Sequence, residues 1–198
     1  MPACLDQRTN MSTLRLPRPT TDEAAAYYQT YIAEVGGDNI GEQLVEQLSQ
    51  VERLFSGLDD AAALARYAPG KWSIKEVLGH LNDSERIFSY RLLRISRGDS
   101  TPLPGFDQNP YVVAGRFDGR PLSDLLGEFR AIRLSTVALS SGIPDEAWSE
   151  RGVASENSVT ARALLYIIVG HVAHHLQVLR DRYGLASAKA TPSVAANR

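Results

Sequence analysis

The chain has 198 residues, and its acidic and basic side chains nearly balance, with a formal net charge of −2. This length suits one domain with a substantial hydrophobic core, and charges of both signs are interspersed, which argues against a nucleic-acid partner. No apolar run approaches the roughly 20 residues that cross a bilayer, so no membrane partner is expected.

Residues 1–19 combine arginines and prolines with polar residues and predict a flexible N-terminal arm. The single cysteine, Cys4, lies in this arm and has no partner for an internal disulfide, which fits a reducing compartment. No apolar segment typical of a secretory signal is present. We therefore expect a cytoplasmic protein with one domain over residues 20–185 and a flexible tail over residues 186–198.

Apolar residues recur at helical spacing through most of this domain, and no stretch alternates convincingly as a strand. Long helices are expected over residues 40–58, 73–98, 121–140 and 158–183. Further helical segments are expected over residues 21–35, between residues 59 and 68, and near residues 144–146. This pattern predicts an all-α fold, an antiparallel four-helix bundle with short extra helices.

Local signals mark the ends of two of these helices. Ser73 is a predicted N-cap with Glu76 three residues later, the spacing of a capping box, and Gly184 is a predicted C-cap of the last helix. Residues 98–120 are rich in Gly, Pro and Asp but also contain aromatic residues. Because connections of this length are usually functional or disordered, we expect this segment to pack over one end of the bundle.

The last predicted helix carries the sequence Gly170-His171-Val172-Ala173-His174-His175. His171 and His175 are four residues apart and share one apolar helix face, where a polar ring without a partner costs roughly 1–3 kcal/mol. A shared metal ion would satisfy both rings; the alternative is a pair of core histidines that hydrogen bond to neighbours. His174 points about 80–100° away from that face and is expected to flank the site.

A third ligand is expected from another helix, and His80 is the one histidine left in the chain. It lies roughly 90° from the centre of the apolar stripe on its own helix. The periodicity therefore leaves two interpretations open, a metal ligand and a half-exposed surface residue.

Two charged residues interrupt the apolar stripes of the long helices. Glu85 lies within the stripe of the helix over residues 73–98, and Arg133 within that of the helix over residues 121–140. Since charged side chains are rare at core positions unless they are paired, we predict a buried Glu85–Arg133 ion pair that joins the two helices. In the alternative, Glu85 is a metal ligand or a general base.

Together these residues resemble the DinB-like (DinB/YfiT) family of metal-binding helical bundles over about residues 38–184. The resemblance is carried by Trp72-Ser73 followed by His80-Leu81, by residues 101–107, and by His171-x-x-x-His175. It implies a four-helix bundle, often a homodimer. It also implies a divalent metal, commonly zinc or nickel, that is held by His80, His171 and His175.

The resemblance also implies chemistry on a small-molecule substrate. Some members of the family transfer bacillithiol, mycothiol or glutathione or isomerise maleylpyruvate with a thiol cofactor, and others are recorded as metal-dependent hydrolases. Three imidazoles leave a coordination position open, as catalytic sites do. We therefore expect a metal-dependent hydrolase or a thiol-dependent S-transferase that uses a low-molecular-weight thiol.

Five further side chains are candidates for this site. Glu85 or His174 would accept a proton, and the segment over residues 98–120 would form a wall of the substrate site through Asp107, Tyr111 or Arg116. Two alternatives from other classes are a metal-binding stress-response module without turnover and a dimeric helical scaffold whose histidines are only packed.

Overall fold

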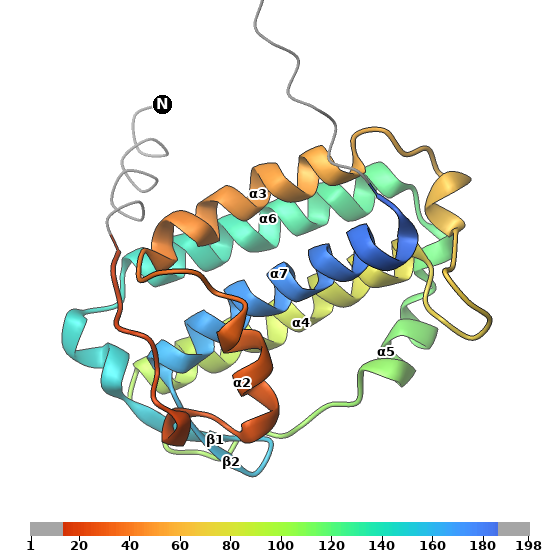
Figure 1. Cartoon of the computed structure of the whole chain (residues 1–198). Helices are drawn as coiled ribbons and strands as arrows, with labels where there is room; N and C mark the ends of the chain where they lie inside the picture. The colour runs from red at the N-terminus through yellow and green to blue at the C-terminus, as the bar shows by residue number, and fades with distance from the viewer. Residues whose placement is uncertain (1–13, 186–198) are drawn as a thin grey trace, which may run out of the picture.

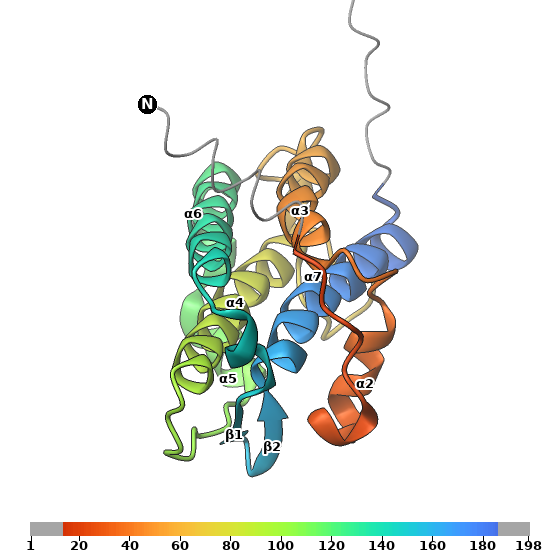
Figure 2. The ribbon, with the colours of Figure 1, turned by 90° about the vertical axis from the view of Figure 1, so that its left-hand side faces the viewer.

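Apolar side chains at helical spacing form a bundle of four long helices in the computed structural model, which describes residues 14–185 (Figure 1). These helices are α3 (Ile40–Phe55), α4 (Ile74–Ser96), α6 (Leu122–Ser141) and α7 (Ala161–Tyr183). They form a ring in the order α3, α6, α4 and α7, in which each helix contacts both of its neighbours (Figure 2). The predicted all-α four-helix bundle is confirmed.

The direction of the chain divides these contacts into two kinds (Figure 1). The pairs α4–α7 and α3–α6 are antiparallel, whereas α3–α7 and α4–α6 are parallel. Along α4 and α6, Asn82 donates to the Leu125 carbonyl and Arg86 to Glu128, so residue numbers rise together. The parallel pairs arise because residues 97–121 run back along the bundle before α6 begins. The bundle therefore contains two parallel helix pairs beside the antiparallel pairs that the sequence predicts.

The first half of helix α7 is enclosed by its neighbours. All its residues from 163 to 172 are buried, because α2 (Ala26–Ala33), α3 and α4 all pack against it. Within the described part of the chain, no helix combines the length and the apolar character that a membrane span requires.

The predicted helix ends agree with the structure at two positions. Ser73 Oγ accepts a hydrogen bond from the Glu76 amide at 3.0 Å, and the Glu76 carboxylate accepts one from the Ser73 amide at 2.8 Å, which confirms the capping box. Gly184 ends α7 with a φ of 70°, the left-handed conformation that glycine adopts without strain.

A β-hairpin that the sequence pattern does not predict directly precedes α7 in the chain. Its strands are β1 (Arg151–Ala154) and β2 (Asn157–Thr160), paired antiparallel. Each strand has only four residues, too few for an alternating pattern to stand out. The Leu103 amide donates to the Val153 carbonyl at 2.9 Å, so the hairpin also holds the start of the 98–120 segment. As a result, α7 begins at Ala161 rather than near residue 158.

The extra helical segments differ from the predicted ones in their bounds and number. The predicted helix over residues 21–35 is divided into η1 (Thr21–Glu23) and α2, because the backbone is extended at Ala24. The other short segments are η2 (Ala62–Leu64), α5 (Gln108–Gly115), η3 (Phe117–Gly119) and η4 (Asp145–Ser149). Helices α5 and η3 lie within the 98–120 segment and contact α4, so this segment packs against the bundle as expected.

The described part of the predicted N-terminal arm, residues 14–19, is docked on the bundle. The Leu16 amide donates to the Asp38 carbonyl at 3.2 Å, and the Leu16 carbonyl accepts from the hydroxyl of Tyr166 at 2.7 Å. Because Leu16 is also buried, this stretch differs from the flexible arm that composition suggests. The rest of the arm, residues 1–13, and the predicted tail, residues 186–198, lie outside the described residues.

Glu23 anchors η1 to the start of α7. Its buried carboxylate accepts hydrogen bonds from Thr160 Oγ1 at 2.7 Å and from the guanidinium of Arg162. Burial raises the pKa of Glu23, but the hydrogen bonds from Arg162, the Thr20 backbone and Thr160 outweigh this and lower the pKa to about 2. Glu23 is therefore ionised in the folded protein at pH values where an unfolded chain is already protonated.

The Glu23 contacts should stabilise the fold above the ordinary glutamate pKa, 4.5, and this stabilisation should be lost as the pH falls toward 2. We expect Glu23→Gln to lower the free energy of unfolding at pH 7 by about 1–3 kcal/mol and to weaken its dependence on pH in this window. Urea denaturation at several pH values measures both effects. Glu46→Gln, at an exposed position of α3, is the control, and equal pH dependence in both variants would contradict this account.

Candidate metal centre

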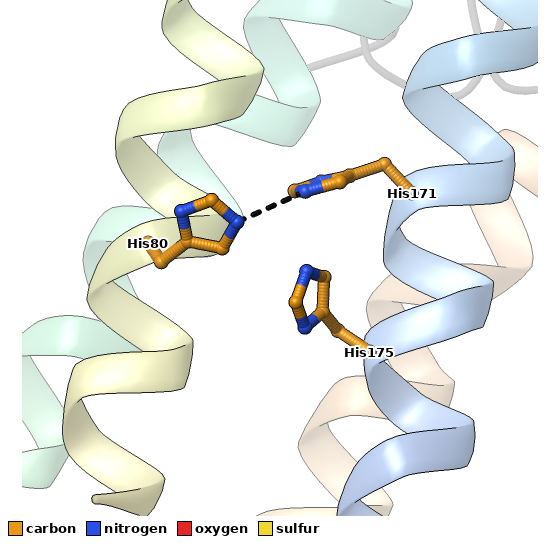
Figure 3. Close-up of side chains that lie close together, drawn as sticks. All are labelled: His80, His171 and His175. Atoms are coloured by element: carbon orange, nitrogen blue, oxygen red, sulfur yellow. Dashed lines mark hydrogen bonds between the residues drawn. The ribbon is translucent and has the colours of Figure 1, made fainter. Parts of the chain in front are cut away.

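Three imidazole rings converge between α4 and α7 (Figure 3). His80 comes from α4, and His171 and His175 come from adjacent turns of α7. One ring nitrogen of each residue lies within 4.8 Å of those of the other two, and Nε2 of His80 is 3.0 Å from Nε2 of His171. The structure thus brings together the three histidines expected as metal ligands, including His80, whose position the periodicity leaves open.

Glycines directly before two of these histidines allow other elements to approach closely. A Cβ atom at Gly79 would lie 2.3 Å from the ring of Phe117, and one at Gly170 would lie 1.9 Å from the carbonyl oxygen of Tyr31. Neither distance is possible for real atoms, so only glycine fits at these positions. Consequently, η3 packs on α4 next to Gly79, and α2 crosses α7 next to Gly170; the crossing of α2 and α7 is visible in Figures 1 and 2.

The environment keeps all three rings neutral. Burial lowers the pKa of His80 to about 4. The pKa of His171 and that of His175 lie well below the usual value, first because of burial and then because neighbouring histidines would repel a charge. Neutral imidazole is the form that binds metal ions. The cluster is therefore ready to bind a metal at neutral pH without losing protons.

The hydrogen bonds of the rings favour a shared ligand over separate core histidines. Ser84 Oγ lies 3.3 Å from Nδ1 of His80, on the side of the ring away from His171. Nε2 of His80 and Nε2 of His171 face one another at 3.0 Å, and the ring of His175 also turns a nitrogen toward them (Figure 3). Imidazole nitrogens suit zinc, nickel and similar transition metals, so the three residues fit such an ion.

A cavity of about 460 Å³ opens directly onto the three histidines. This volume is typical of small-molecule sites. Most of the wall is aromatic, and within the described residues no aspartate, glutamate, lysine or arginine lines it. Besides the histidines, the lining residues are Tyr27, Tyr28, Tyr31, Trp72, Ser84, Phe88, Phe106, Gln108 and Ser155.

Sequence reasoning misses most of this wall. The three tyrosines come from α2, which reaches the histidines because its backbone meets α7 at Gly170. Periodicity within α2 does not reveal this tertiary contact. From the 98–120 segment, Phe106 and Gln108 line the cavity. The residues predicted there do not: Asp107 caps α5, Tyr111 packs against Phe106, and Arg116 lies between α5 and η3.

Glu85 and Arg133 form the predicted buried ion pair. Nε of Arg133 donates to Oε1 of Glu85 and Nη2 to Oε2, each at 2.7 Å. Nη1 of Arg133 also donates to the Leu44 carbonyl at 2.9 Å and to Gln47 at 2.6 Å, which ties α6 to α3 as well as to α4. This interpretation is confirmed, and Glu85, with both oxygens bound to Arg133, does not line the cavity.

His174 flanks the cluster and is half-buried. Its ring lies 5.2 Å from that of His175 and 5.4 Å from that of Tyr31, measured between ring centres. It does not line the cavity either. The roles of Glu85 and His174 as proton acceptors stay predictions.

Comparisons with known proteins agree with this architecture. A family model described as the DinB superfamily matches residues 43–179. YfiT from Bacillus subtilis, described as "a probable metal-dependent hydrolase with an unusual four-helix bundle topology", is 17% identical and superimposes with a TM-score of 0.63 over 89% of this chain and 99% of YfiT. No curated protein sequence matches the chain.

A mycothiol-dependent maleylpyruvate isomerase is also similar in structure. It is 14% identical, with a TM-score of 0.60, and the match covers 79% of this chain but only 64% of the isomerase. At such low identities, the two structural similarities show a shared fold.

The Glu85–Arg133 pair should be essential for stability. Arg133→Met leaves the Glu85 carboxylate buried without its cation, and we expect the free energy of unfolding to fall by about 3–5 kcal/mol. The double variant Glu85→Gln with Arg133→Met should regain much of this loss. Urea denaturation provides the measurement.

Arg130→Met is the matched control for this experiment. Arg130 lies on the same helix and pairs with Glu52 at the surface, so its replacement should cost less than about 1 kcal/mol. Near-normal stability of Arg133→Met would contradict the structural role of the buried pair.

Proposed function

The chain belongs to the DinB superfamily, and we propose that it is a metal-dependent enzyme that acts on a small molecule. One observation carries this proposal: three neutral imidazoles, two buried and one half-buried, converge on a cavity with no acidic or basic side chain in its described lining. The size of the cavity supports a small-molecule substrate. The description of YfiT as "a probable metal-dependent hydrolase" supports the same class of activity.

In this proposal, His80, His171 and His175 hold the metal, and zinc or nickel is the expected ion. Three imidazoles leave at least one coordination position open toward the cavity. A divalent ion held there would supply Lewis-acid chemistry, which lowers the pKa of a water toward about 7 and keeps a thiol ionised.

The other side chains of the site orient groups and exclude water. Ser84 fixes the ring of His80 through Nδ1. Burial and then the 2.8 Å hydrogen bond to Tyr27 raise the pKa of Tyr31 well above its usual range. Tyr31 therefore stays protonated and acts as a hydrogen-bond donor rather than as a base.

His174 is the better placed of the two expected proton acceptors. Its ring lies beside that of His175, whereas both oxygens of Glu85 are occupied by Arg133. We assign to Glu85 a positioning role, because it joins α4, which carries His80, to α6.

Hydrolysis is our first candidate reaction and thiol-dependent S-transfer the second. The match covers 99% of YfiT, described as "a probable metal-dependent hydrolase", but only 64% of the mycothiol-dependent isomerase, so this chain spans YfiT more completely. A low-molecular-weight thiol would bind at the same open position. We further propose that the protein acts in the cytoplasm and as a homodimer, both of which follow from the sequence and the family resemblance.

His175→Ala tests the metal site directly. Residues that only orient a metal ligand change the metal affinity by about 10–100-fold. Loss of the ligand itself should therefore lower the metal affinity by more than this factor and abolish activity. Elemental analysis of the purified protein and assays with ester, amide and thiol-conjugation substrates measure the two effects. Metal-free wild-type protein that shows no thermal shift with zinc, nickel or manganese would contradict the proposal and favour the scaffold interpretation.

His174→Ala is the matched variant on the neighbouring position. It should keep the metal content, and it should lower kcat by about 100-fold or more because general acid–base catalysis typically contributes that much. If turnover is undetectable in the wild type while the metal is bound, the non-catalytic metal-binding module is the correct interpretation.

Ser84→Ala should weaken metal binding without removing a ligand. The lost contact orients His80, and we expect about a 10-fold decrease in metal affinity, measured by competition with a chromophoric chelator. Ser89→Ala on the same helix, where the hydroxyl donates to the Arg86 carbonyl, is the control. Equal affinities in the two variants would show that Ser84 does not position His80.

A further inference from the structure

Two arginines of the bundle are almost completely buried, and they differ in their partners. Arg133 is paired with Glu85, as described above. Arg91, on α4, is only 2% exposed, yet it forms no ion pair with any carboxylate in residues 14–185. A buried charge is costly unless a counter-charge compensates it, so the described chain leaves this cation uncompensated.

The neighbours of Arg91 are neutral and belong to one end of the cavity. Nη2 donates to the Pro104 carbonyl at 2.7 Å and to Ser155 Oγ at 3.0 Å, and Nη1 donates to the Tyr28 hydroxyl at 3.5 Å. The guanidinium carbon lies 6.0 Å from the ring centre of Phe88 and 5.9 Å from that of Phe106. Except for Pro104, all of these neighbours line the cavity.

The direction of these hydrogen bonds leaves two donors facing the cavity. A guanidinium only donates, so Ser155 Oγ and the Tyr28 hydroxyl act as acceptors toward Arg91. Among the described residues, neither hydroxyl donates its own hydrogen to another group. Each can therefore donate to a ligand in the cavity, with a positive charge directly behind it. Such charge-assisted donors suit an anionic acceptor.

Ser155 occupies this position at the expense of an unfavourable backbone conformation. Ser155 and Glu156 form the two-residue turn between β1 and β2, with φ values of 51° and 65°. Such turns strongly favour glycine or asparagine, and strained residues are often retained where they serve a site. The Ser155 amide also donates to the Leu103 carbonyl at 3.0 Å, which fixes the serine at the cavity.

The arginine end and the histidine end belong to one small-molecule site. The ring of Phe88 lies between them, with its centre 5.5 Å from that of His171 and 6.0 Å from the Arg91 guanidinium carbon. Within the described lining no carboxylate opposes an anion.

We propose that this site takes substrates with a carboxylate group, which binds the Ser155 and Tyr28 hydroxyls beside Arg91 while the reacting bond faces the three histidines. This inference rests on the proposed function of the cavity and adds the substrate class.

A matched pair of probes tests this proposal. Phenylacetate and phenylacetamide have nearly the same shape and differ in charge, and isothermal titration calorimetry gives their Kd values for the zinc-loaded full chain. We expect phenylacetate to bind at least about 10-fold more tightly, since hydrogen bonds to charged groups are typically worth that factor. The preference should remain in His175→Ala, because its origin is at the other end of the cavity.

Three variants assign the preference to named residues. Arg91→Met replaces the buried charge by an apolar side chain of similar length, an exchange that buried sites often tolerate. Ser155→Gly removes the hydroxyl and also relieves the strained turn, so the fold should be retained or stabilised. Both should abolish the preference for phenylacetate while leaving the affinity for phenylacetamide and the zinc content unchanged. Arg97→Met, at an exposed position after α4, should behave as the wild type.

Two outcomes would overturn the proposal. The first is equal affinity of the wild type for both probes, or a preference that survives both Arg91→Met and Ser155→Gly. The second is a preference that disappears in His175→Ala but persists in Arg91→Met, because the carboxylate would then bind at the histidines. Failure of the proposed metal-dependent function has a different signature, namely no zinc binding by the wild type together with an intact, Arg91-dependent preference.

Discussion

The antiparallel packing of α4 against α7 is the constraint on which the rest of this site depends. It places one histidine of α4 opposite two histidines of α7, with two rings buried and one half-buried, and no carboxylate of the described residues lines their cavity. Buried imidazoles without counter-charges remain neutral, and neutral rings turned toward one another present lone pairs that a cation can satisfy together. Gly79 and Gly170 complete this arrangement because they admit Phe117 and α2 beside the cluster.

Features that depend on a single helical turn could be predicted from the sequence. The capping box at Ser73 and the C-cap at Gly184 are set by contacts within a few residues. The shared face of His171 and His175 follows from their spacing alone. The Glu85–Arg133 pair was predictable for a related reason: a charge within an apolar stripe has few alternatives to a partner on a facing helix.

Features that depend on several elements could not be predicted in this way. The periodicity of α4 places His80 at the edge of the core, but α6, α7, α5 and η3 all contact this helix, so its buried face is wider than one apolar stripe. The β-hairpin depends on pairing with Leu103, far from it in the sequence. The tyrosines of α2 reach the histidines only because Gly170 lets two backbones meet.

The two buried arginines show how one fold separates structural from binding charges. Arg133 receives a counter-charge from the chain itself, so its field is largely cancelled and the pair serves to join α3, α4 and α6. Within residues 14–185, Arg91 donates only to neutral acceptors, so its field extends through Ser155 and Tyr28 into the cavity. Because aromatic walls keep the local dielectric constant low, that field acts more strongly on a bound anion than it would in water. An anionic group drawn to this end would leave the remainder of the molecule beside the histidines, and a single uncompensated charge would thus orient the substrate.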